Sequence, residues 1–129
     1  MSGNAYLFVY GTLRPGAGCA LGRLARERLR QETVDRGPAT MRGRLIDLGR
    51  YPGLVANGGQ GIVHGELLAL KSPSLTWLWL DAYEGGGYRR VVGEAVSTTM
   101  ARRVRAYCYV CKSAPGSAAL IRSGDWLKQ

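Results

Sequence analysis

Apolar positions along the chain recur with two different spacings, which predict where strands and helices form. Residues 6–10, Tyr-Leu-Phe-Val-Tyr, are aromatic or β-branched and apolar on both faces, as in a largely buried strand. Similar reasoning predicts further strands over residues 40–48, 62–70, 88–98 and 102–111. A short turn separates the last two of these strands, and such a connection is typical of antiparallel neighbours.

Two segments have the spacing of an amphipathic helix. In residues 19–30 the apolar positions are Leu21, Leu24, Ala25 and Leu29. The residues expected to face solvent are Arg23, Arg26, Glu27 and Arg30. Gly22 weakens this helix. A second helix opens at Pro73-Ser74 with Ser74 as candidate N-cap, and three consecutive glycines, residues 85–87, end it. Its apolar face is formed by Leu75, Leu78, Trp79 and Ala82.

The remaining segments are punctuated by glycine and proline. Residues 11–18 and 57–61 are predicted loops, residues 50–54 a turn, and Gly37-Pro38 a break before the second strand. The tail, residues 118–128, has weak helical character. Strands outnumber helices, so the pattern favours an α+β domain with a largely antiparallel sheet or barrel. A length of 129 residues is that of one domain, spanning 1–129.

Composition narrows the class of protein. Hydrophobic residues make up 46% of the chain, an ordinary globular value, and no apolar run approaches the roughly 20 residues needed to cross a bilayer. The N-terminus lacks the basic and apolar regions of a signal peptide. Three cysteines cannot form a disulfide framework, so we expect a cytoplasmic protein.

The chain carries a net charge of +9, which could attract nucleic acid or small anions. The arginines are scattered along the chain, however, and do not cluster with the aromatic residues in a known nucleic-acid-binding signature. We therefore expect no nucleic-acid partner and no membrane partner.

Metal and nucleophile chemistry have little support in the sequence. Cys108 and Cys111 form one pair with knuckle-like spacing, but a zinc site needs four ligands and the only histidine is His64. The two cysteines also lie in an expected strand, where residues three apart face opposite sides. No cysteine or serine has a recognisable nucleophile signature. We expect no metal and no cofactor.

Two features could carry other chemistry. The glycine-rich segment 11–18 lies between an expected strand and an expected helix, a context suited to binding anions through backbone N–H groups. Its spacing matches no known phosphate loop, and a tight strand-to-helix connection is the alternative interpretation. Glu66, in the strand over residues 62–70, is a second candidate carboxylate, although an inward Glu66 would need a partner.

Glu84 stands out among the carboxylates. It ends the second helix, where the negative end of the helix dipole disfavours a carboxylate, and Tyr83 and Tyr88 flank it. Both effects raise the pKa of a carboxyl group and suit it to proton transfer near neutrality. The alternative is a solvated loop residue beside Arg89 and Arg90, which composition alone would favour.

Several motifs in order resemble the gamma-glutamylcyclotransferase-like family, most closely its short members that act on gamma-glutamylamines. The first block is residues 8–16, Phe-Val-Tyr-Gly-Thr-Leu-Arg-Pro-Gly, and the second is residues 80–90, Leu-Asp-Ala-Tyr-Glu-Gly-Gly-Gly-Tyr-Arg-Arg. Further family-like blocks lie at residues 51–54, 63–67, 106–109 and 124–126. The resemblance spans nearly the whole chain.

The resemblance implies a small mixed barrel, mostly antiparallel, with two or three short helices and a cavity. It implies that the loop of Tyr10, Gly11, Thr12 and Leu13 binds the glutamyl head group through backbone N–H groups, and that Glu84 is the acid/base residue. The implied reaction releases 5-oxoproline from a small gamma-glutamyl substrate, without metal or cofactor. Arg14, Arg89 and Arg90 would add positive potential near the head group. A monomer and a homodimer both remain open, and the alternatives are a non-catalytic binding module on the same fold or a basic nucleic-acid-binding domain.

Overall fold

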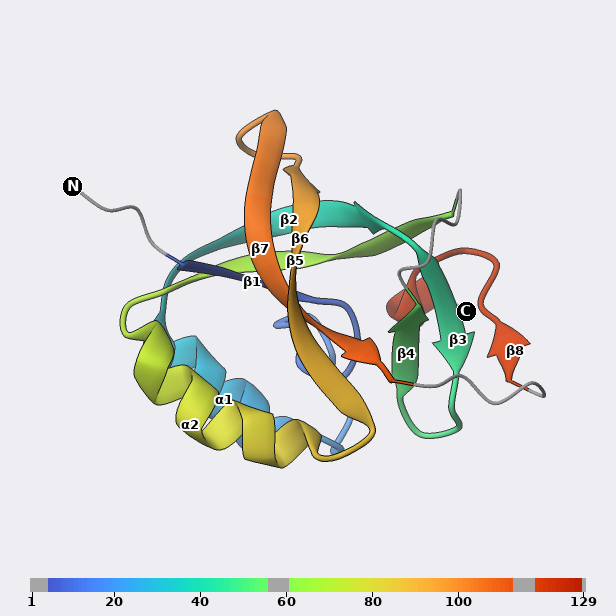
Figure 1. Cartoon of the computed structure of the whole chain (residues 1–129), viewed down its shortest axis with the longest axis horizontal. Coiled ribbons are helices and arrows are strands. Elements are labelled where there is room, and N and C mark those ends of the chain that lie inside the picture. The colour runs from blue at the N-terminus through green and yellow to red at the C-terminus, as the bar shows by residue number, and fades with distance from the viewer. Residues whose placement is uncertain (1–4, 56–60, 113–117, 129) are drawn as a thin grey trace.

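Five strands of the computed structural model, which describes residues 5–55, 61–112 and 118–128, close into a barrel (Figure 1). In spatial order they are β1 (Ala5–Val9), β5 (Ile62–Leu70), β2 (Thr33–Arg42), β6 (Tyr88–Ser97) and β7 (Arg102–Cys111). Neighbouring strands pair antiparallel except β1 and β7, which run parallel and meet at Leu7 and Tyr107. The expected α+β fold with a mixed, mostly antiparallel barrel is confirmed.

The two α-helices pack together on one side of the barrel, and a second sheet lies at its other end (Figure 1). The helices are α1 (Arg23–Glu32) and α2 (Pro73–Glu84). The small sheet has the order β4 (Pro52–Val55), β3 (Arg44–Asp47) and β8 (Ala119–Leu120). A final 3₁₀ turn, η1, spans Trp126–Lys128.

The alternation of side chains along β1 divides the core into two clusters. Phe8 and Tyr10 point into the barrel with the residues that fill its interior, whereas Leu7 and Val9 pack against α1 and α2. This two-residue period is the one expected of a strand that is buried on both faces. The strand over residues 6–10 is therefore buried as the sequence predicts.

Three expectations about strands and turns are wrong. Residues 40–48 do not form one strand, because Gly43 has a φ of +152° and separates β2 from β3. Pro38 does not break the chain but lies within β2, where its carbonyl accepts a hydrogen bond from the Thr98 N–H. Residues 52–54 of the expected turn belong to strand β4. The expected helical character of the tail is also wrong, because the tail contains β8 and η1. The predicted loop at 57–61 falls mostly outside the described residues.

The faces of both helices differ from those expected. Helix α1 begins at Arg23, after Gly22 in the left-handed region at a φ of +81°, rather than at residue 19. Within it Leu24 is 74% exposed and Arg26 only 8% exposed, the reverse of the prediction. Helix α2 is capped at Ser72 rather than Ser74.

The stripe of α2 that packs against the barrel contains Thr76 and Leu80, whereas Leu78 is 76% exposed. Residues four apart share one face of a helix, so Glu84 continues this inward stripe. Among the described residues, no helix is long and apolar enough to cross a membrane.

Candidate active site

A cavity of about 310 Å³ opens where β1 ends, and segments far apart in sequence form its walls. The loop after β1 forms one wall, the end of α2 a second, and β4, β6 and β7 the others. All five residues singled out from the sequence line this cavity: Tyr10, Gly11, Thr12, Leu13 and Glu84. The structure brings them together, and their roles in binding and catalysis stay predictions.

The loop after β1 is a tight turn whose central N–H groups lack protein acceptors. The Arg14 N–H donates to the Gly11 carbonyl at 3.1 Å, which closes a four-residue turn around Thr12 and Leu13. Within the described ranges, no acceptor takes the N–H of either central residue. Two backbone donors on a cavity wall can bind a carboxylate or a developing oxyanion.

Gly11 is required by the packing of the loop rather than by its backbone angles. A Cβ atom at this position would lie 2.7 Å from Cγ of Pro52, a distance that no packed side chain tolerates. Pro52 itself lines the cavity and begins β4. The absence of a side chain at Gly11 therefore lets the loop approach β4 closely and shapes the cavity.

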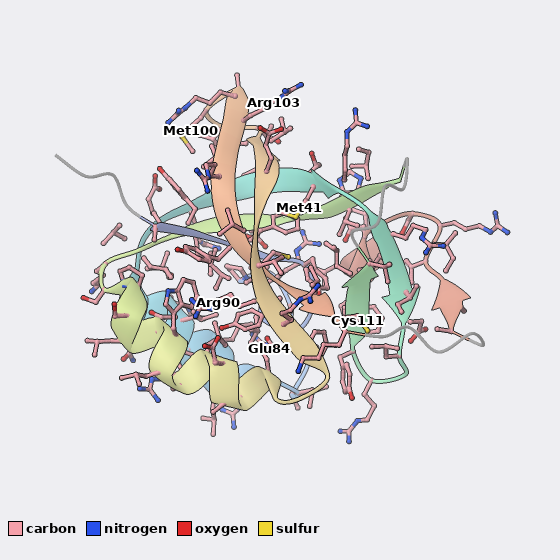
Figure 2. All side chains as sticks on the ribbon, in the orientation of Figure 1. Met41, Glu84, Arg90, Met100, Arg103 and Cys111 are labelled. Carbon is pink, nitrogen blue, oxygen red and sulfur yellow. The ribbon has the colours of Figure 1, made fainter. Side chains whose placement is uncertain are left out.

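Glu84 places its carboxyl group at this cavity, from the barrel-facing side of α2 (Figure 2). Burial raises the pKa of Glu84 from 4.5 to about 7. Among the described residues, none donates a hydrogen bond to its carboxylate, so nothing offsets the loss of hydration. A carboxyl group with a pKa near neutrality can both accept and donate a proton at physiological pH.

Three tyrosines around Glu84 have their hydroxyls engaged with backbone or side-chain oxygens. Tyr10 donates to the Tyr109 carbonyl at 2.6 Å and accepts from the Leu54 N–H at 3.1 Å. Tyr88 donates to the Pro52 carbonyl at 2.7 Å. Burial raises the pKa of Tyr10, Tyr88 and Tyr109, so all three are neutral donors at physiological pH. Because their hydroxyls are fixed in this way, the tyrosines form rigid walls.

Asp81, three residues before Glu84, attaches the end of α2 to β7 and β6. The hydroxyl of Tyr109 donates to Oδ1 of Asp81, and Nε of Arg90 lies 3.2 Å from the same oxygen. Arg90 also stacks over Trp77 at 4.4 Å from the ring centroid. These contacts hold the helix that carries Glu84 against the barrel.

Arg14 does not line the cavity, although it directly follows the loop in sequence. Its Nη1 donates to Asp125 at 2.7 Å and its Nε to Glu66 at 3.3 Å, so its charge is used in a network of three partly buried side chains. Arg36 adds a longer contact to Glu66, at 3.8 Å. Glu66 is therefore an ion-pair partner and not a competing acid/base residue. Arg14 joins three of the family-like blocks: the loop, residues 63–67 and residues 124–126.

The other two arginines proposed to attract the substrate also lie elsewhere. Neither Arg89 nor Arg90 lines the cavity. The Arg89 side chain is exposed, and Arg90 pairs with Asp81. Neither arginine therefore contacts the cavity directly, and a positive potential from them near the head group stays a prediction.

The cysteines take up separate positions. Cys108 is fully buried inside the barrel, whereas Cys111 is partly exposed near β4 (Figure 2), and Cys19 is exposed. Burial raises the pKa of the Cys108 thiol, which keeps it protonated. Across the described ranges, no three His, Cys, Asp or Glu side chains are grouped to bind a metal.

Sequence reasoning missed two groups of residues that form the site. The aromatic walls Tyr51, Tyr83, Tyr88 and Tyr109 lie in the family-like blocks. From the sequence, Tyr83 and Tyr88 are identified only as neighbours of Glu84, and Tyr51 and Tyr109 have no predicted role. Arg26, expected to face solvent, is buried and binds the loop through the Thr12 carbonyl at 2.7 Å. Its position could not be read from helical spacing, because a long arginine side chain can turn back beneath its own helix.

Comparison with known proteins gives a consistent result across nearly the whole chain. Residues 7–128 match the family described as "Gamma-glutamyl cyclotransferase, AIG2-like". The gamma-glutamylcyclotransferase family protein YtfP of Escherichia coli K12 is 32% identical over 121 residues, which cover 94% of this chain and 95% of that protein.

Two solved structures share the fold. YkqA from Bacillus subtilis superposes with a TM-score of 0.70 at 27% identity, covering 95% of this chain and 39% of YkqA. An AIG2-like protein from Mus musculus superposes with a TM-score of 0.68 at 21% identity, covering 89% of this chain and 82% of the mouse protein. The arrangement of the barrel and helices is thus common to these proteins.

Proposed function

Because the chain belongs to the gamma-glutamyl cyclotransferase, AIG2-like family, we propose that it is an enzyme that cyclises gamma-glutamyl amides and releases 5-oxoproline and a free amine. The observation that carries this proposal is the placement of Glu84. A carboxyl group with a pKa raised to about 7 lines the same cavity as a turn with two backbone N–H donors, for which the described residues provide no acceptor. An intramolecular amide transfer requires this combination of groups.

The substrate supplies its own nucleophile. Its α-amine nitrogen attacks the γ-carbonyl carbon, so a new C–N bond forms and the carbonyl oxygen becomes an oxyanion. The α-amine enters as an ammonium and must first lose a proton, which the ionised carboxylate of Glu84 accepts. Because the two reacting groups belong to one molecule, the cavity need only hold it in a near-cyclic conformation.

The same carboxyl group completes the reaction. The tetrahedral intermediate collapses when its oxyanion re-forms the carbonyl and the C–N bond to the leaving amine breaks. Glu84, now protonated, donates its proton to that amine and returns to its ionised state. The attacking nitrogen also loses a second proton, to the solvent, as it becomes the ring N–H of 5-oxoproline. A pKa near neutrality suits a group that must be a base in one step and an acid in the next.

The loop and the tyrosines support the charged parts of this reaction. The N–H groups of Thr12 and Leu13 are available to the oxyanion or to the α-carboxylate of the substrate. The aromatic walls lower the polarity around the substrate, which strengthens hydrogen bonds made inside the cavity.

Small gamma-glutamylamines are the substrates that fit this site best. Glycines 85–87 leave the end of α2 without side chains, and no atom lies within 4 Å of where their Cβ atoms would be. These glycines directly follow Glu84, so we propose that the leaving amine lies toward this uncrowded segment and the glutamyl head lies at the loop. We expect several amines to be accepted and the α-carboxamide analogue of the head group to be rejected.

Incubation with a panel of gamma-glutamyl compounds, assayed for 5-oxoproline, tests the proposal. The E84Q variant is the matched control, since glutamine has the same shape but cannot transfer a proton. Release of 5-oxoproline by the wild type and not by E84Q supports the proposal. Binding of these compounds by calorimetry without any product would instead identify a non-catalytic binding module.

A further inference from the structure

Arg26 is a buried arginine that connects the beginning and the end of the substrate loop. Its Nη1 donates to the Thr12 carbonyl at 2.7 Å and to the Leu21 carbonyl at 3.2 Å, and its Nη2 donates to the Cys19 carbonyl at 2.8 Å. The whole residue is 8% exposed. One side chain of α1 thus joins Thr12 at the beginning of the loop to Cys19 and Leu21 at its end.

The charge of Arg26 is not neutralised by a carboxylate. The ion pairs among the described residues involve other arginines, and Arg26 binds carbonyl oxygens and, more distantly, the Cys19 sulfur. Burying an unpaired guanidinium is costly, and an apolar residue could fill the same place without that cost. The groups that Arg26 contacts therefore indicate a role beyond packing.

The contact with Thr12 acts on the peptide group that joins Thr12 to Leu13. This peptide is trans, as are all peptide bonds in the described structure, so its carbonyl and its N–H point in opposite directions. Arg26 lies outside the cavity, whereas Thr12 and Leu13 line it. Anchoring the carbonyl on Arg26 therefore turns the Leu13 N–H away from α1, toward the cavity side of the loop.

The same contact strengthens that N–H as a donor. A hydrogen bond from a cation to the carbonyl draws electron density from the amide nitrogen, and hydrogen bonds in such a chain reinforce one another. The Leu13 N–H has no acceptor among the described residues, so the effect is available to a ligand.

We propose that Arg26 is a positioning residue, which orients and polarises the Thr12–Leu13 peptide so that the Leu13 N–H binds the substrate carboxylate or the developing oxyanion. This inference rests on the proposed function. Arg26 polarises the Leu13 N–H through the Thr12 carbonyl, whereas Arg14, Arg89 and Arg90 do not line the cavity. Arg26 touches no substrate; it acts through the backbone of the loop.

The amide ¹⁵N resonances of the resting protein test this role without any turnover. In R26M the Leu13 ¹⁵N signal should move upfield, because its peptide carbonyl loses a cationic donor. Thr12 is the internal control, since its own peptide carbonyl, that of Gly11, is bound by the Arg14 N–H and not by Arg26. R26K, which keeps a cation, should restore part of the shift, and it replaces R26M if the methionine variant does not fold.

Kinetics give the second measurement, normalised to the folded fraction. Loss of an entire oxyanion donor costs about 10²–10³ in rate, so weakening one donor should lower kcat/KM about tenfold in R26M, with partial recovery in R26K. R30M is the matched control: Arg30 is an exposed arginine one turn further along α1, and its loss should leave kcat/KM unchanged.

Equal ¹⁵N shifts for Thr12 and Leu13, or a kcat/KM for R26M equal to that of R30M, would overturn the role assigned to Arg26. Those outcomes would reduce Arg26 to a structural clamp of the loop. A wild-type protein that releases no 5-oxoproline would instead refute the proposed function, and the Leu13 shift would still decide whether Arg26 polarises the peptide.

Discussion

Tyr109 donates its phenolic hydroxyl to the carboxylate of Asp81, at 2.5 Å, and thereby joins strand β7 to helix α2. Asp81 lies three residues before Glu84, which is less than one helical turn. The position of the candidate acid/base residue is thus set in part by a contact between a strand that lines the cavity and the helix that carries Glu84.

Replacing Tyr109 with phenylalanine removes the anchor of α2 while keeping the ring. Hydrogen bonds to charged groups contribute about 1.5–3 kcal/mol, and Asp81 is half-exposed, so we expect a loss of about 1–2 kcal/mol in urea unfolding, with reduced turnover. Y6F is the control, since the Tyr6 hydroxyl has no hydrogen bond among the described residues. Equal stability and turnover of the two variants would show that the contact does not position Glu84.

Replacing Glu84 with glutamine should abolish turnover and preserve the fold. The change keeps the size of the side chain but removes the group that accepts and donates the proton, a loss of about 10²–10⁴-fold. Circular dichroism checks the fold, and release of 5-oxoproline checks the activity. Wild-type turnover in E84Q would rule out Glu84 as the acid/base residue.

The raised pKa of Glu84 also predicts how stability depends on pH. Below pH 4.5 the group is protonated in the folded and unfolded chains, and its burial carries no ionisation penalty. Between pH 4.5 and about 7 the unfolded chain ionises first, so the wild type loses stability relative to E84Q. The total difference is about 3 kcal/mol, since one unit of pKa corresponds to about 1.4 kcal/mol. Urea unfolding at several pH values would reveal it, whereas parallel curves would contradict the raised pKa.

The same ionisation should govern activity. Only the ionised carboxylate of Glu84 can accept the first proton, so kcat/KM should rise with pH and level off above about 7. A pH-rate profile for the wild type measures this rise. A midpoint near the ordinary value of 4.5 would mean that the buried Glu84 carboxyl is not the essential base.

Adding one methyl group at Gly11 should disturb the cavity through Pro52. The new Cβ would lie 2.7 Å from Pro52 Cγ, and overpacking of this kind costs about 1–3 kcal/mol. We expect G11A to lose ligand affinity, measured by calorimetry, and P52A to restore part of it in the double variant. G18A is the control, because no atom lies within 4 Å of a Cβ there. Wild-type affinity in G11A would show that the loop is only a connector.

Removing the charge of Arg14 should be one of the more destabilising arginine substitutions. R14M leaves the partly buried Asp125 without its cation and Glu66 with only the longer contact to Arg36, and breaking a buried pair costs about 3–5 kcal/mol. R103M is the control, since its pair with Glu94 is exposed at the tip of the β6–β7 hairpin (Figure 2) and should change stability by less than about 1 kcal/mol. Similar losses in the two variants would show that burial does not strengthen the Arg14 network.

Most barrel strands and the place of Glu84 could be predicted from sequence because their signals are local, whereas the roles of the site residues came from the resemblance to the family. The alternation in residues 62–70 defines β5 to the residue, and the position of Glu84 before three glycines places it at the end of α2. The turn at residues 11–14 is likewise encoded by adjacent residues. In each case neighbouring positions carry the whole signal.

The errors arise where contacts between distant segments decide the structure. Leu78 is apolar but exposed, and the inward stripe instead includes Thr76, because its hydroxyl is satisfied by Glu32 of α1 at 2.6 Å. Pro38 is accommodated within β2 because neighbouring strands supply the pairing. Arg26 is buried because carbonyl oxygens of the preceding loop surround its guanidinium. All of these partners belong to another helix, strand or loop, so the periodicity of a single segment does not reveal them.

The parallel pairing of β1 with β7 has a consequence for the order in which the protein folds. The paired residues, Leu7 and Tyr107, are far apart in sequence, and the hydrogen bond from Tyr10 to Tyr109 spans 99 residues. Closing so long a loop is entropically costly, and contacts of this kind form late. The hairpin of β6 and β7 can form early, but the cavity needs β1 and β7 to be paired. A nascent chain therefore cannot assemble this site until β7 has left the ribosome, so the chemistry proposed for it becomes possible only after the β6–β7 hairpin has been made.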